Sequence, residues 1–279
     1  MKIVVTGAVG RVGRYVVDEL VPRHEVVAVD ARAPARDDVP FVRADILSLD
    51  ECRRAVEGAD AVIHLAAIPN PLTDPAERVM HVNTMGTWTV LQACAEAGVR
   101  RFVQASTDSA LGFVFRRQEF RPAYLPIDEA HPLLAQDPYG LSKLLGEQIC
   151  WSFARGWDIE TVCVRICRVI FPDDEATNRR LADDPSLMAK GLWVYVDARD
   201  AARAFRLAAE TPGLNREAVF AGAPDAYSRV PTADLIARFY PDLAPMADRL
   251  PANASFITSA KAKAVLGWEP RFTWRDVVR

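Results

Sequence analysis

Hydrophobic positions in the first two thirds of the chain alternate between short continuous runs and longer stretches with a helical period. Continuous apolar runs rich in β-branched residues predict buried strands, whereas apolar residues spaced three and four apart predict helices with one buried face. The predicted strands are Ile3–Thr6, Glu25–Asp30, Ala61–Ala66, Arg101–Ser106 and Ile159–Ile170. The predicted helices are Val12–Leu20, Cys52–Gly58, Ala76–Ala97 and Pro138–Arg155.

This strict succession of strand and helix is typical of βαβ units, which are joined by right-handed crossovers. It predicts an α/β fold of the Rossmann type, in which a doubly wound parallel sheet is covered by helices on both faces. Residues 1–171 are expected to form this dinucleotide-binding domain. Residues 193–211, with a strand at Val194–Asp197 and an alanine-rich helix at Ala198–Glu210, are expected to return to it.

The pattern changes after Phe171, where residues 172–192 are charged and show no regular period. Further along the chain, Thr232–Phe239 and Ser259–Leu266 predict two short helices. Ligands of open α/β sheets bind in the crevice beyond the carboxyl ends of the strands. We therefore expect 172–192 and 212–279 to form a small substrate-binding cap over that edge.

Composition narrows the class of protein. Half of the 279 residues are hydrophobic and a quarter are charged, which is ordinary for a globular protein, and the net charge of −3 argues against a nucleic-acid partner. No run of eighteen apolar residues predicts a membrane span, and the first strand leaves no room for a signal peptide. The five cysteines never form a CxxC motif, so free thiols in a reducing cytoplasm are expected: Cys52, Cys94, Cys150, Cys163 and Cys167.

A glycine-rich turn, Thr6-Gly7-Ala8-Val9-Gly10-Arg11-Val12-Gly13, joins the first strand to the first helix. Gly7 and Gly10 let the backbone approach a diphosphate, and Gly13 lets the helix pack close to the strand. The N-terminus of that helix offers unpaired N–H groups to the phosphates. The residues expected to contact a dinucleotide here are Gly7, Val9, Gly10, Arg11, Val12 and Gly13.

Asp30, seventeen residues after Gly13, ends the second strand. A carboxylate at this place accepts hydrogen bonds from ribose hydroxyls and repels a 2′-phosphate, so NAD is favoured over NADP. Arg11, Arg32 and Arg36 lie nearby in the sequence and leave NADP open, although a solvated loop is the preferred interpretation of Arg32 and Arg36. 

Asp45 and Ile46 follow a third apolar run. Two interpretations stand equal for them. They either contact the edge of the adenine of the cofactor or cap the N-terminus of the next helix.

Tyr139 and Lys143 are four residues apart and therefore share one face of a predicted helix. A nearby ammonium group lowers the pKa of a phenol and makes it a usable acid and base. The strand at Arg101–Ser106 leads into Thr107, whose hydroxyl is expected at the carboxyl edge of the sheet, where it can orient a substrate oxygen.

With these motifs, the chain resembles the extended short-chain dehydrogenases/reductases, the NAD-dependent epimerase/dehydratase group. The resemblance covers Met1 to about Ile170, Trp193–Glu210 and Lys261–Pro270, and includes His64–Ala67 and Asn83–Thr87. It implies that Thr107, Tyr139 and Lys143 are catalytic, that Asn83 organises the lysine, and that Lys143 binds the nicotinamide ribose. The cofactor-binding set is completed by Leu65, Ala66, Ala67, Asn83, Tyr139, Lys143 and Ile166, and the substrate-binding set comprises Ile68, Thr107, Asp108, Ser109, Tyr139, Cys167 and Arg179.

One departure from the family's sequence pattern limits the type of reaction expected. Sugar dehydratases carry Thr-Asp-Glu at the strand end, whereas this chain has Thr107-Asp108-Ser109. Serine does not abstract a carbon-bound proton at neutral pH, so dehydration is not expected. Asp108 is interpreted as a turn residue in preference to a catalytic acid.

A second departure concerns substrate size. Residues 172–192 are shorter than the segment that grips the nucleotide in nucleotide-sugar epimerases, which favours a small substrate and resembles the uronate dehydrogenases. In those enzymes an arginine just beyond Phe-Pro holds the carboxylate. Here Asn178 falls near that place, followed by Arg179 and Arg180, and Ser109 replaces a histidine.

The segment Gly112–Glu129 is aromatic and basic. It either folds over the substrate and supplies an arginine, or forms a surface loop, which is the preferred interpretation. His64, His81 and His131 are expected to be structural, and no cluster of ligands predicts a metal. Cys167 is expected to line the nicotinamide pocket.

The leading hypothesis is an NAD-dependent oxidoreductase that transfers a hydride between nicotinamide and a small polar hydroxy or carbonyl compound, and the expected compound is a sugar or sugar acid. The alternatives are a sugar 4-epimerase with the same trio and a non-catalytic NAD-binding sensor. The apolar faces of Ala76–Ala97 and Pro138–Arg155, together with the resemblance, imply a homodimer.

Overall fold

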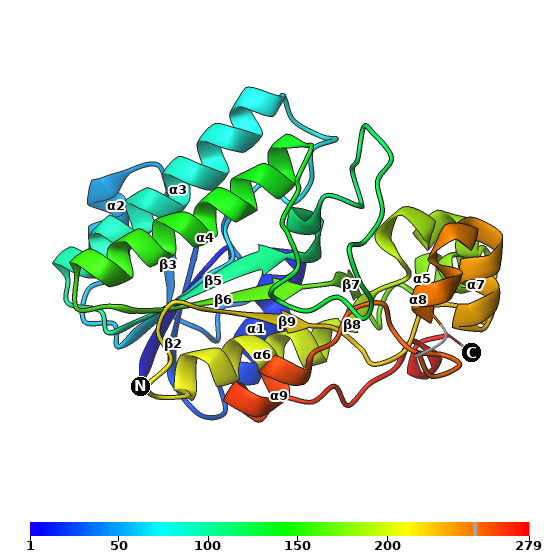
Figure 1. Cartoon of the computed structure of the whole chain (residues 1–279). Coiled ribbons are helices and arrows are strands. Elements are labelled where there is room, and N and C mark those ends of the chain that lie inside the picture. Colours follow the sequence, from blue (N-terminus) through cyan, green and yellow to red (C-terminus); the bar gives the residue numbers. More distant parts are fainter. Residues whose placement is uncertain (248–249, 279) are drawn as a thin grey trace.

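A parallel sheet of seven strands forms the centre of the molecule, which we describe from a computed structural model covering residues 1–247 and 250–278 (Figure 1). The strand order is β3-β2-β1-β4-β5-β6-β9, and every neighbouring pair is parallel. This confirms the Rossmann-type prediction. The strands are β1 (Lys2–Thr6), β2 (Glu25–Asp30), β3 (Phe41–Arg43), β4 (Ala61–His64), β5 (Arg101–Thr107), β6 (Glu160–Ile166) and β9 (Glu217–Ala221).

Helices cover both faces of the sheet, as expected for a doubly wound fold (Figure 1). One face carries α2 (Leu49–Ala55), α3 (Ala76–Glu96) and α4 (Pro138–Gly156). The other carries α1 (Arg11–Leu20), α6 (Ala198–Glu210) and α9 (Ala260–Leu266). Each face has its own apolar core between helices and sheet, because the central strands are hydrophobic on both sides.

The run Ile159–Ile170 was expected to be one strand, and the structure divides it. The main sheet takes β6 up to Ile166, and the chain then turns at Cys167 into β7 (Arg168–Ile170). β7 pairs with β8 (Tyr195–Asp197) in a separate sheet of two strands. The hydrophobic run could not reveal this break, because both halves are buried and apolar.

The cap lies beyond the carboxyl ends of the strands and has an aromatic core of its own. It contains α5 (Glu175–Asp183), which forms in a segment expected to be irregular, together with α7 (Thr232–Phe239) and α8 (Ala244–Ala247). The assignment of all of 212–279 to the cap was wrong. β9 extends the main sheet beside β6, and α9 packs below that sheet through Ala262 and Leu266.

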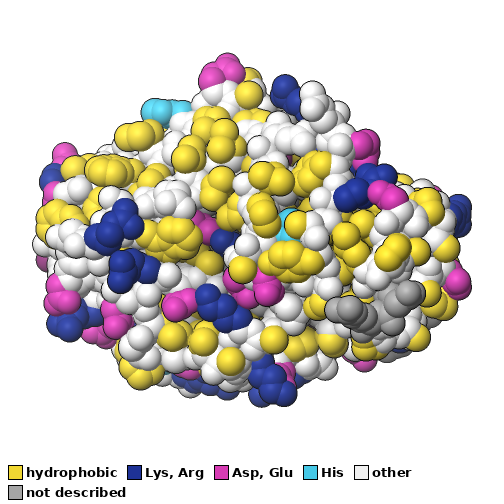
Figure 2. All heavy atoms as spheres, viewed as in Figure 1, with side chains coloured by type: hydrophobic (Ala, Val, Ile, Leu, Met, Phe, Trp, Pro, Cys, Tyr) yellow, Lys and Arg dark blue, Asp and Glu magenta, His cyan; other side chains and the backbone are white. Residues whose placement is uncertain are grey.

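The two long helices α3 and α4 leave apolar side chains on the molecular surface. Figure 2 shows hydrophobic side chains gathered over this part of the molecule, at the upper left. The most exposed of them are Met85 at 45%, Trp88 at 44%, Leu141 at 39% and Leu145 at 37%.

Candidate active site

The glycine-rich turn forms a cradle for a diphosphate at the carboxyl end of β1. Gly7 has φ +70°, and a side chain there would approach the backbone nitrogen of Ala66 to 2.6 Å. A side chain on Gly13 would collide with the carbonyl of Gly7, so only glycine allows α1 to lie this close to the strand. Gly10 is the N-cap residue of α1, and no side chain caps the helix there. The first N–H groups of α1 are therefore available to an anion.

Asp30 stands beside the same turn. Its carboxylate accepts the backbone N–H of Val9 at 3.1 Å and of Arg32 at 3.0 Å, and its side chain is only 10% exposed. Arg36 is held by Asp18 and Asp38 on the protein surface. Arg32 remains 73% exposed beside Asp30. This arrangement fits a ribose better than a ribose 2′-phosphate, since the carboxylate of Asp30 lies beside the turn and Arg36 is already paired.

The structure excludes one of the two interpretations of Asp45 and leaves contact with an adenine as a prediction. The N-cap of α2 is Ser48, whose side chain accepts the N–H of Glu51, so the capping interpretation of Asp45 was wrong. Asp45 instead accepts the N–H of Leu47 in a tight turn. Ile46 packs against Gly86 of α3, where a side chain would collide with it.

The expected catalytic side chains converge at the carboxyl end of β5. Asp137 caps α4 by accepting the N–H groups of Tyr139 and Gly140, both at 2.9 Å. A side chain on Gly140 would lie 2.6 Å from the carbonyl oxygen of Ser109, so glycine lets the start of α4 approach the strand end. This close approach brings Tyr139 beside Thr107, whose hydroxyl acts on the pKa of the phenol.

Burial controls the acidity of these groups. It raises the pKa of Tyr139 well above its usual value, an effect that Thr107 partly offsets. It also lowers the pKa of Lys143 to about 8. The expected lowering of the Tyr139 pKa by Lys143 is not seen in the chain by itself. The ammonium nitrogen lies 6.0 Å from the centre of the phenol ring and donates to the carbonyl of Ala105 at 2.9 Å.

Asn83 holds a neighbouring loop and does not contact Lys143 directly. Its side chain exchanges two hydrogen bonds with the backbone of Ile68, at 2.8 and 3.1 Å, and donates to Ser142 at 2.9 Å. Ile68 follows β4 and precedes Pro69, which lines the cleft described next. Asn83 therefore fixes that loop against α4, one residue away from Lys143.

A cleft of about 820 Å³ joins the glycine-rich turn, the strand ends and the cap. Eight of the residues predicted for cofactor or substrate line it: Arg11, Val12, Thr107, Asp108, Ser109, Tyr139, Ile166 and Cys167. Asp108 is buried, which raises the pKa of its carboxyl group to about 6, and it accepts a hydrogen bond from Thr107 at 3.1 Å. The sequence thus identified eight of the residues that line this cleft, and the others come from segments for which it predicted no role in the site.

Arg179 does not lie in the cleft, which corrects its assignment to the substrate site. It projects from the outer face of α5 and pairs with Glu175 at 2.8 Å. Asn178, one residue earlier, is buried and lines the cleft. Successive residues on a helix point about 100° apart, so only one of the two can face inward.

The cleft also contains residues that the sequence analysis missed. Val114 and Phe115, from the loop before α4, form one wall, and the ring of Phe115 meets that of Tyr139 edge-on with centres 6.3 Å apart. The interpretation of this segment as a surface loop was therefore incomplete. Arg168, at the start of β7, lies in the same cleft. Its position was hidden because the break between β6 and β7 was not predicted.

Comparison with known proteins now identifies the family. Residues 3–221 match the NAD-dependent epimerase/dehydratase family. The chain belongs to this family. An L-arabinose 1-dehydrogenase (NAD(P)(+)) of Haloferax volcanii is 32% identical over 200 residues, covering 69% of this chain and 77% of the relative. A uronate dehydrogenase of Pseudomonas syringae pv. tomato is 28% identical over 223 residues, covering 78% and 73%.

The fold of this epimerase/dehydratase family member also matches solved structures. A short-chain dehydrogenase/reductase superfamily protein from Agrobacterium tumefaciens, crystallised with bound NAD, aligns with a TM-score of 0.76 and 25% identity. The alignment covers 100% of this chain and 95% of that one. The cradle of Gly7, Gly10 and Gly13, the uncapped start of α1 and the carboxylate of Asp30 fit the NAD cofactor of the family.

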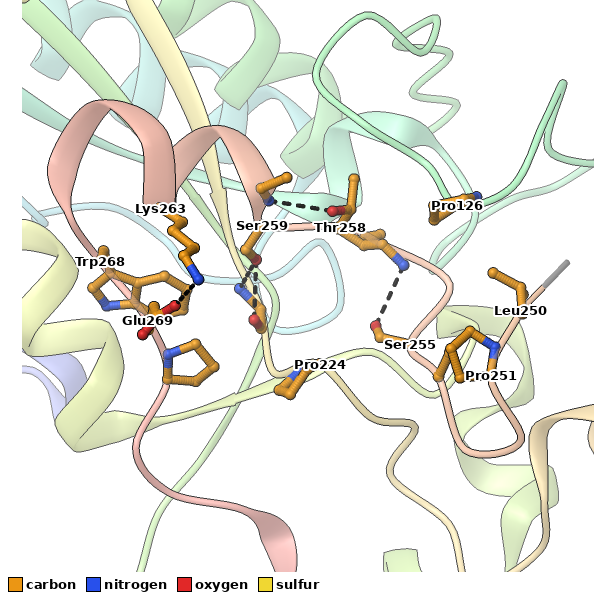
Figure 3. Close-up of a pocket in the computed structure, with 15 residues that line it drawn as sticks. Pro126, Pro224, Leu250, Pro251, Ser255, Thr258, Ser259, Lys263, Trp268 and Glu269 are labelled. Carbon is orange, nitrogen blue, oxygen red and sulfur yellow. Dashed lines mark hydrogen bonds and ion pairs between the residues drawn. The ribbon is translucent and has the colours of Figure 1, made fainter.

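A second hollow, of about 450 Å³, lies between α9 and the segment around Pro251 (Figure 3). Its charged side chains Lys263 and Glu269 pair with each other, and Ser259 exchanges hydrogen bonds with the backbone of Gly222 (Figure 3). It lies apart from the glycine-rich turn and Tyr139. The cleft that Thr107 and Tyr139 line together is therefore the candidate active site.

In the part of the chain that the structure describes, no helix combines the length and apolar character needed to cross a membrane. Within the same residues, no group of three or more His, Cys, Asp or Glu side chains is placed to hold a metal ion.

His64 is buried beside Thr6, and burial lowers its pKa to about 3, so it is neutral. His81, expected to pack inside, is exposed on α3.

Proposed function

We propose that this chain is an NAD-dependent dehydrogenase that oxidises a hydroxyl group of a small sugar or sugar acid. The observation that carries the proposal is the meeting of Thr107 and Tyr139 in one cleft with the glycine-rich turn. The arabinose and uronate dehydrogenases among the relatives support the substrate class.

The roles of the side chains follow from their chemistry. NAD, when bound, accepts or returns a hydride at its nicotinamide ring. Thr107 holds the substrate oxygen by hydrogen bonding, and the phenol of Tyr139 takes or gives the proton of that oxygen. Lys143 supplies positive charge below the phenol and binds ribose hydroxyls. Because the Lys143 pKa is about 8, its charge is available through neutral pH.

The size of the cleft supports a small substrate. Its volume of about 820 Å³ must accommodate the reacting end of the cofactor as well as the substrate. The short segment between β7 and β8 folds as α5 and a 3-10 turn against it, and Asn178 and Met188 from this segment line the cleft.

The proposal is tested by mixing the enzyme with NAD and a panel of free sugars, sugar acids and nucleotide sugars while NADH absorbance is recorded. We expect NADH with one or more of the free sugars or sugar acids. In Tyr139→Phe we expect kcat to fall by roughly a thousandfold or more, because the proton acceptor is lost. NAD affinity, measured by quenching of tryptophan fluorescence, should change little. A response to nucleotide sugars alone would contradict the small-substrate proposal.

A sugar 4-epimerase is the second candidate, because the same trio and the same family serve that reaction. An epimerase keeps its cofactor and returns the hydride, so it produces no net NADH. Epimer formation without NADH would select this candidate. A non-catalytic NAD sensor would instead show NAD binding that Tyr139→Phe leaves intact, with no turnover of any sugar.

We also propose that the protein is a cytoplasmic homodimer. The four exposed apolar side chains on α3 and α4 support a twofold interface between these helices. The five cysteines are free and buried, which is compatible with a reducing compartment.

A further inference from the structure

The cleft contains a cationic side chain that neither the glycine-rich turn nor the catalytic trio uses. Arg168 begins β7, two residues after Ile166. Ile166 pairs with Thr107 across the β5–β6 ladder, so these two residues share one level of the sheet edge. Arg168 therefore stands just beyond the level of the catalytic hydroxyl, with its side chain open to the cleft.

The charges around this cleft are unevenly paired. Arg11 lies 3.1 Å from Asp174 and stacks on the ring of Phe171, so its charge is already balanced. Arg168 makes no ion pair or side-chain hydrogen bond with any residue that the structure describes. Lys190 lines the cleft from the cap side, and within the same described residues it too has no ion-pair partner.

The protein around Arg168 already removes part of its hydration. This desolvation lowers the pKa of the guanidinium group, while nearby Asp108 acts in the opposite direction. Asp108 forms no ion pair with Arg168 and instead accepts a hydrogen bond from Thr107. A partly desolvated guanidinium gains from an oxyanion that approaches it directly, because its planar fork donates two parallel hydrogen bonds to a carboxylate or phosphate.

We propose that Arg168 binds the anionic group of the substrate, and that the substrate is an acidic sugar derivative bearing a carboxylate or a phosphate. This inference rests on the proposed dehydrogenase function and narrows it. The two kinds of relative are named for a neutral pentose and for a sugar acid. In this cleft a neutral pentose would leave Arg168 without a partner, whereas a sugar acid would form an ion pair with it. The shared chemistry is an oxyanion held beyond the reacting carbon, and the experiment separates its two sources.

The kinetic test compares each acidic sugar with the neutral sugar of the same configuration: galacturonate with galactose, glucuronate with glucose, and glucose 6-phosphate with glucose. The variants are Arg168→Gln and, as a matched control, Arg54→Gln on the exposed surface of α2. We expect the native enzyme to prefer an acidic member. In Arg168→Gln the KM of that acid should rise roughly ten- to a hundredfold, with a smaller change in kcat. Arg54→Gln should behave as the native enzyme.

A binding measurement gives a readout that does not depend on turnover. Galactarate, a dicarboxylate without a reactive aldehyde carbon, and inorganic phosphate are each titrated into the NAD-loaded protein while its melting temperature is recorded. We expect stabilisation by one of these anions in the native protein and in Arg54→Gln, and its loss in Arg168→Gln. Stabilisation by galactarate assigns a carboxylate, and stabilisation by phosphate assigns a phosphorylated sugar.

The outcomes separate this inference from the proposed function. Efficient NADH formation from neutral sugars, unchanged in Arg168→Gln, would overturn the inference and leave the dehydrogenase proposal standing. An Arg168-dependent stabilisation by either anion without NADH from any sugar would support the anion site and contradict the dehydrogenase. Equal stabilisation of native protein and Arg168→Gln would overturn the inference.

Discussion

At the scale of single residues, burial sets the protonation of the side chains that line the cleft. Burial raises the pKa of Tyr139 above its ordinary value and lowers the pKa of Lys143 to about 8. Asp108 sits in the same environment, and its carboxyl pKa of about 6 is above its ordinary 3.8. Removing water therefore favours the neutral form of each group, whichever sign its charge has.

Because the pKa of the Asp108 carboxyl group is raised, we predict that Asp108→Asn is more stable than the native protein by an amount that depends on pH. Above pH 6 the native protein carries a buried charge that costs free energy, and below pH 3.8 the group is neutral in both the folded and unfolded states. The free-energy cost of the buried charge thus appears as the pH rises from 3.8 to about 6. We expect the variant to gain about 3 kcal/mol in free energy of unfolding at pH 8 and about 1 kcal/mol less at pH 5.

Urea unfolding at the two pH values measures this difference. Asp158→Asn is the control, because that carboxyl group is 90% exposed. A gain for Asp108→Asn that is the same at both pH values would show that the native carboxyl is not perturbed.

The carboxylate of Asp30 is expected to set the relative affinity for NAD and NADP. Replacing it by asparagine removes the negative charge that repels a 2′-phosphate, and the exposed Arg32 is then free to attract one. We expect the affinity for NADPH relative to NADH to rise roughly tenfold, which corresponds to about 1.4 kcal/mol. Fluorescence titration of both reduced nucleotides measures the ratio. Asp37→Asn, in the exposed loop that follows, should leave it unchanged.

At the scale of elements, α4 is fixed to the sheet at two levels. At the first level, Lys143 donates to the carbonyl oxygen of Ala105 in β5 at 2.9 Å. Two turns after Tyr139, Glu147 forms a fully buried pair with Arg165 of β6, with hydrogen bonds of 2.8 and 2.9 Å, and accepts another from Ser106 of β5 at 2.6 Å. This connection sets the register of α4 against both strands, and hence the position of Tyr139 relative to Thr107.

Breaking this pair on one side should be strongly destabilising. Arg165→Leu leaves the buried carboxylate of Glu147 without its partner, so we expect a loss of about 3–5 kcal/mol in free energy of unfolding. The double variant Glu147→Leu/Arg165→Leu should recover most of this loss, since no buried charge remains. Guanidinium chloride unfolding of the two proteins makes the comparison. A double variant no more stable than the single one would mean that the uncompensated charge is not the cause.

At the scale of the whole molecule, the candidate active site lies at the boundary between two cores. The sheet core supplies the glycine-rich turn and the strand ends, and the aromatic core of the cap supports the opposite wall. Ion pairs from Arg11 and Arg14 of α1 to Asp174 and Asp173 link the two across the cleft. The helices α3 and α4, which carry exposed apolar side chains, cover one face of the sheet, whereas the cap lies beyond the strand ends (Figure 1).

The exposed apolar side chains of α3 and α4 predict the effect of surface charge on assembly. If α3 and α4 pair with a second copy, Trp88→Arg or Leu145→Glu places a charge in an apolar interface and should convert a dimer into a monomer. Leu72→Glu is the control, because Leu72 is 79% exposed in the loop before α3. Light scattering after size-exclusion chromatography gives the mass. A native protein that is monomeric at micromolar concentration would contradict the dimer proposal.

The sequence was most informative where local pattern and function coincide. The alternation of apolar runs with helical periods predicted the parallel sheet, and the glycine spacing predicted the turn at Gly7–Gly13. Tyr139 was found because its partner lies one helical turn away. Arg179 was misplaced because an irregular pattern gave no helical phase, and without a phase the inward neighbour, Asn178, could not be distinguished.

Local order along the first two thirds of the chain, then, was determined by the sequence itself: which apolar runs form buried strands, which periodic stretches form helices, and where the glycine-rich turn lies. Only the tertiary structure decided which distant groups meet. It moved β9 into the main sheet, turned Arg168 into the cleft and placed Phe115 against Tyr139. The physical reason is the distance along the chain over which each effect acts. Periodicity and capping act over a few residues, whereas burial, desolvation and charge pairing depend on neighbours that the fold alone brings together.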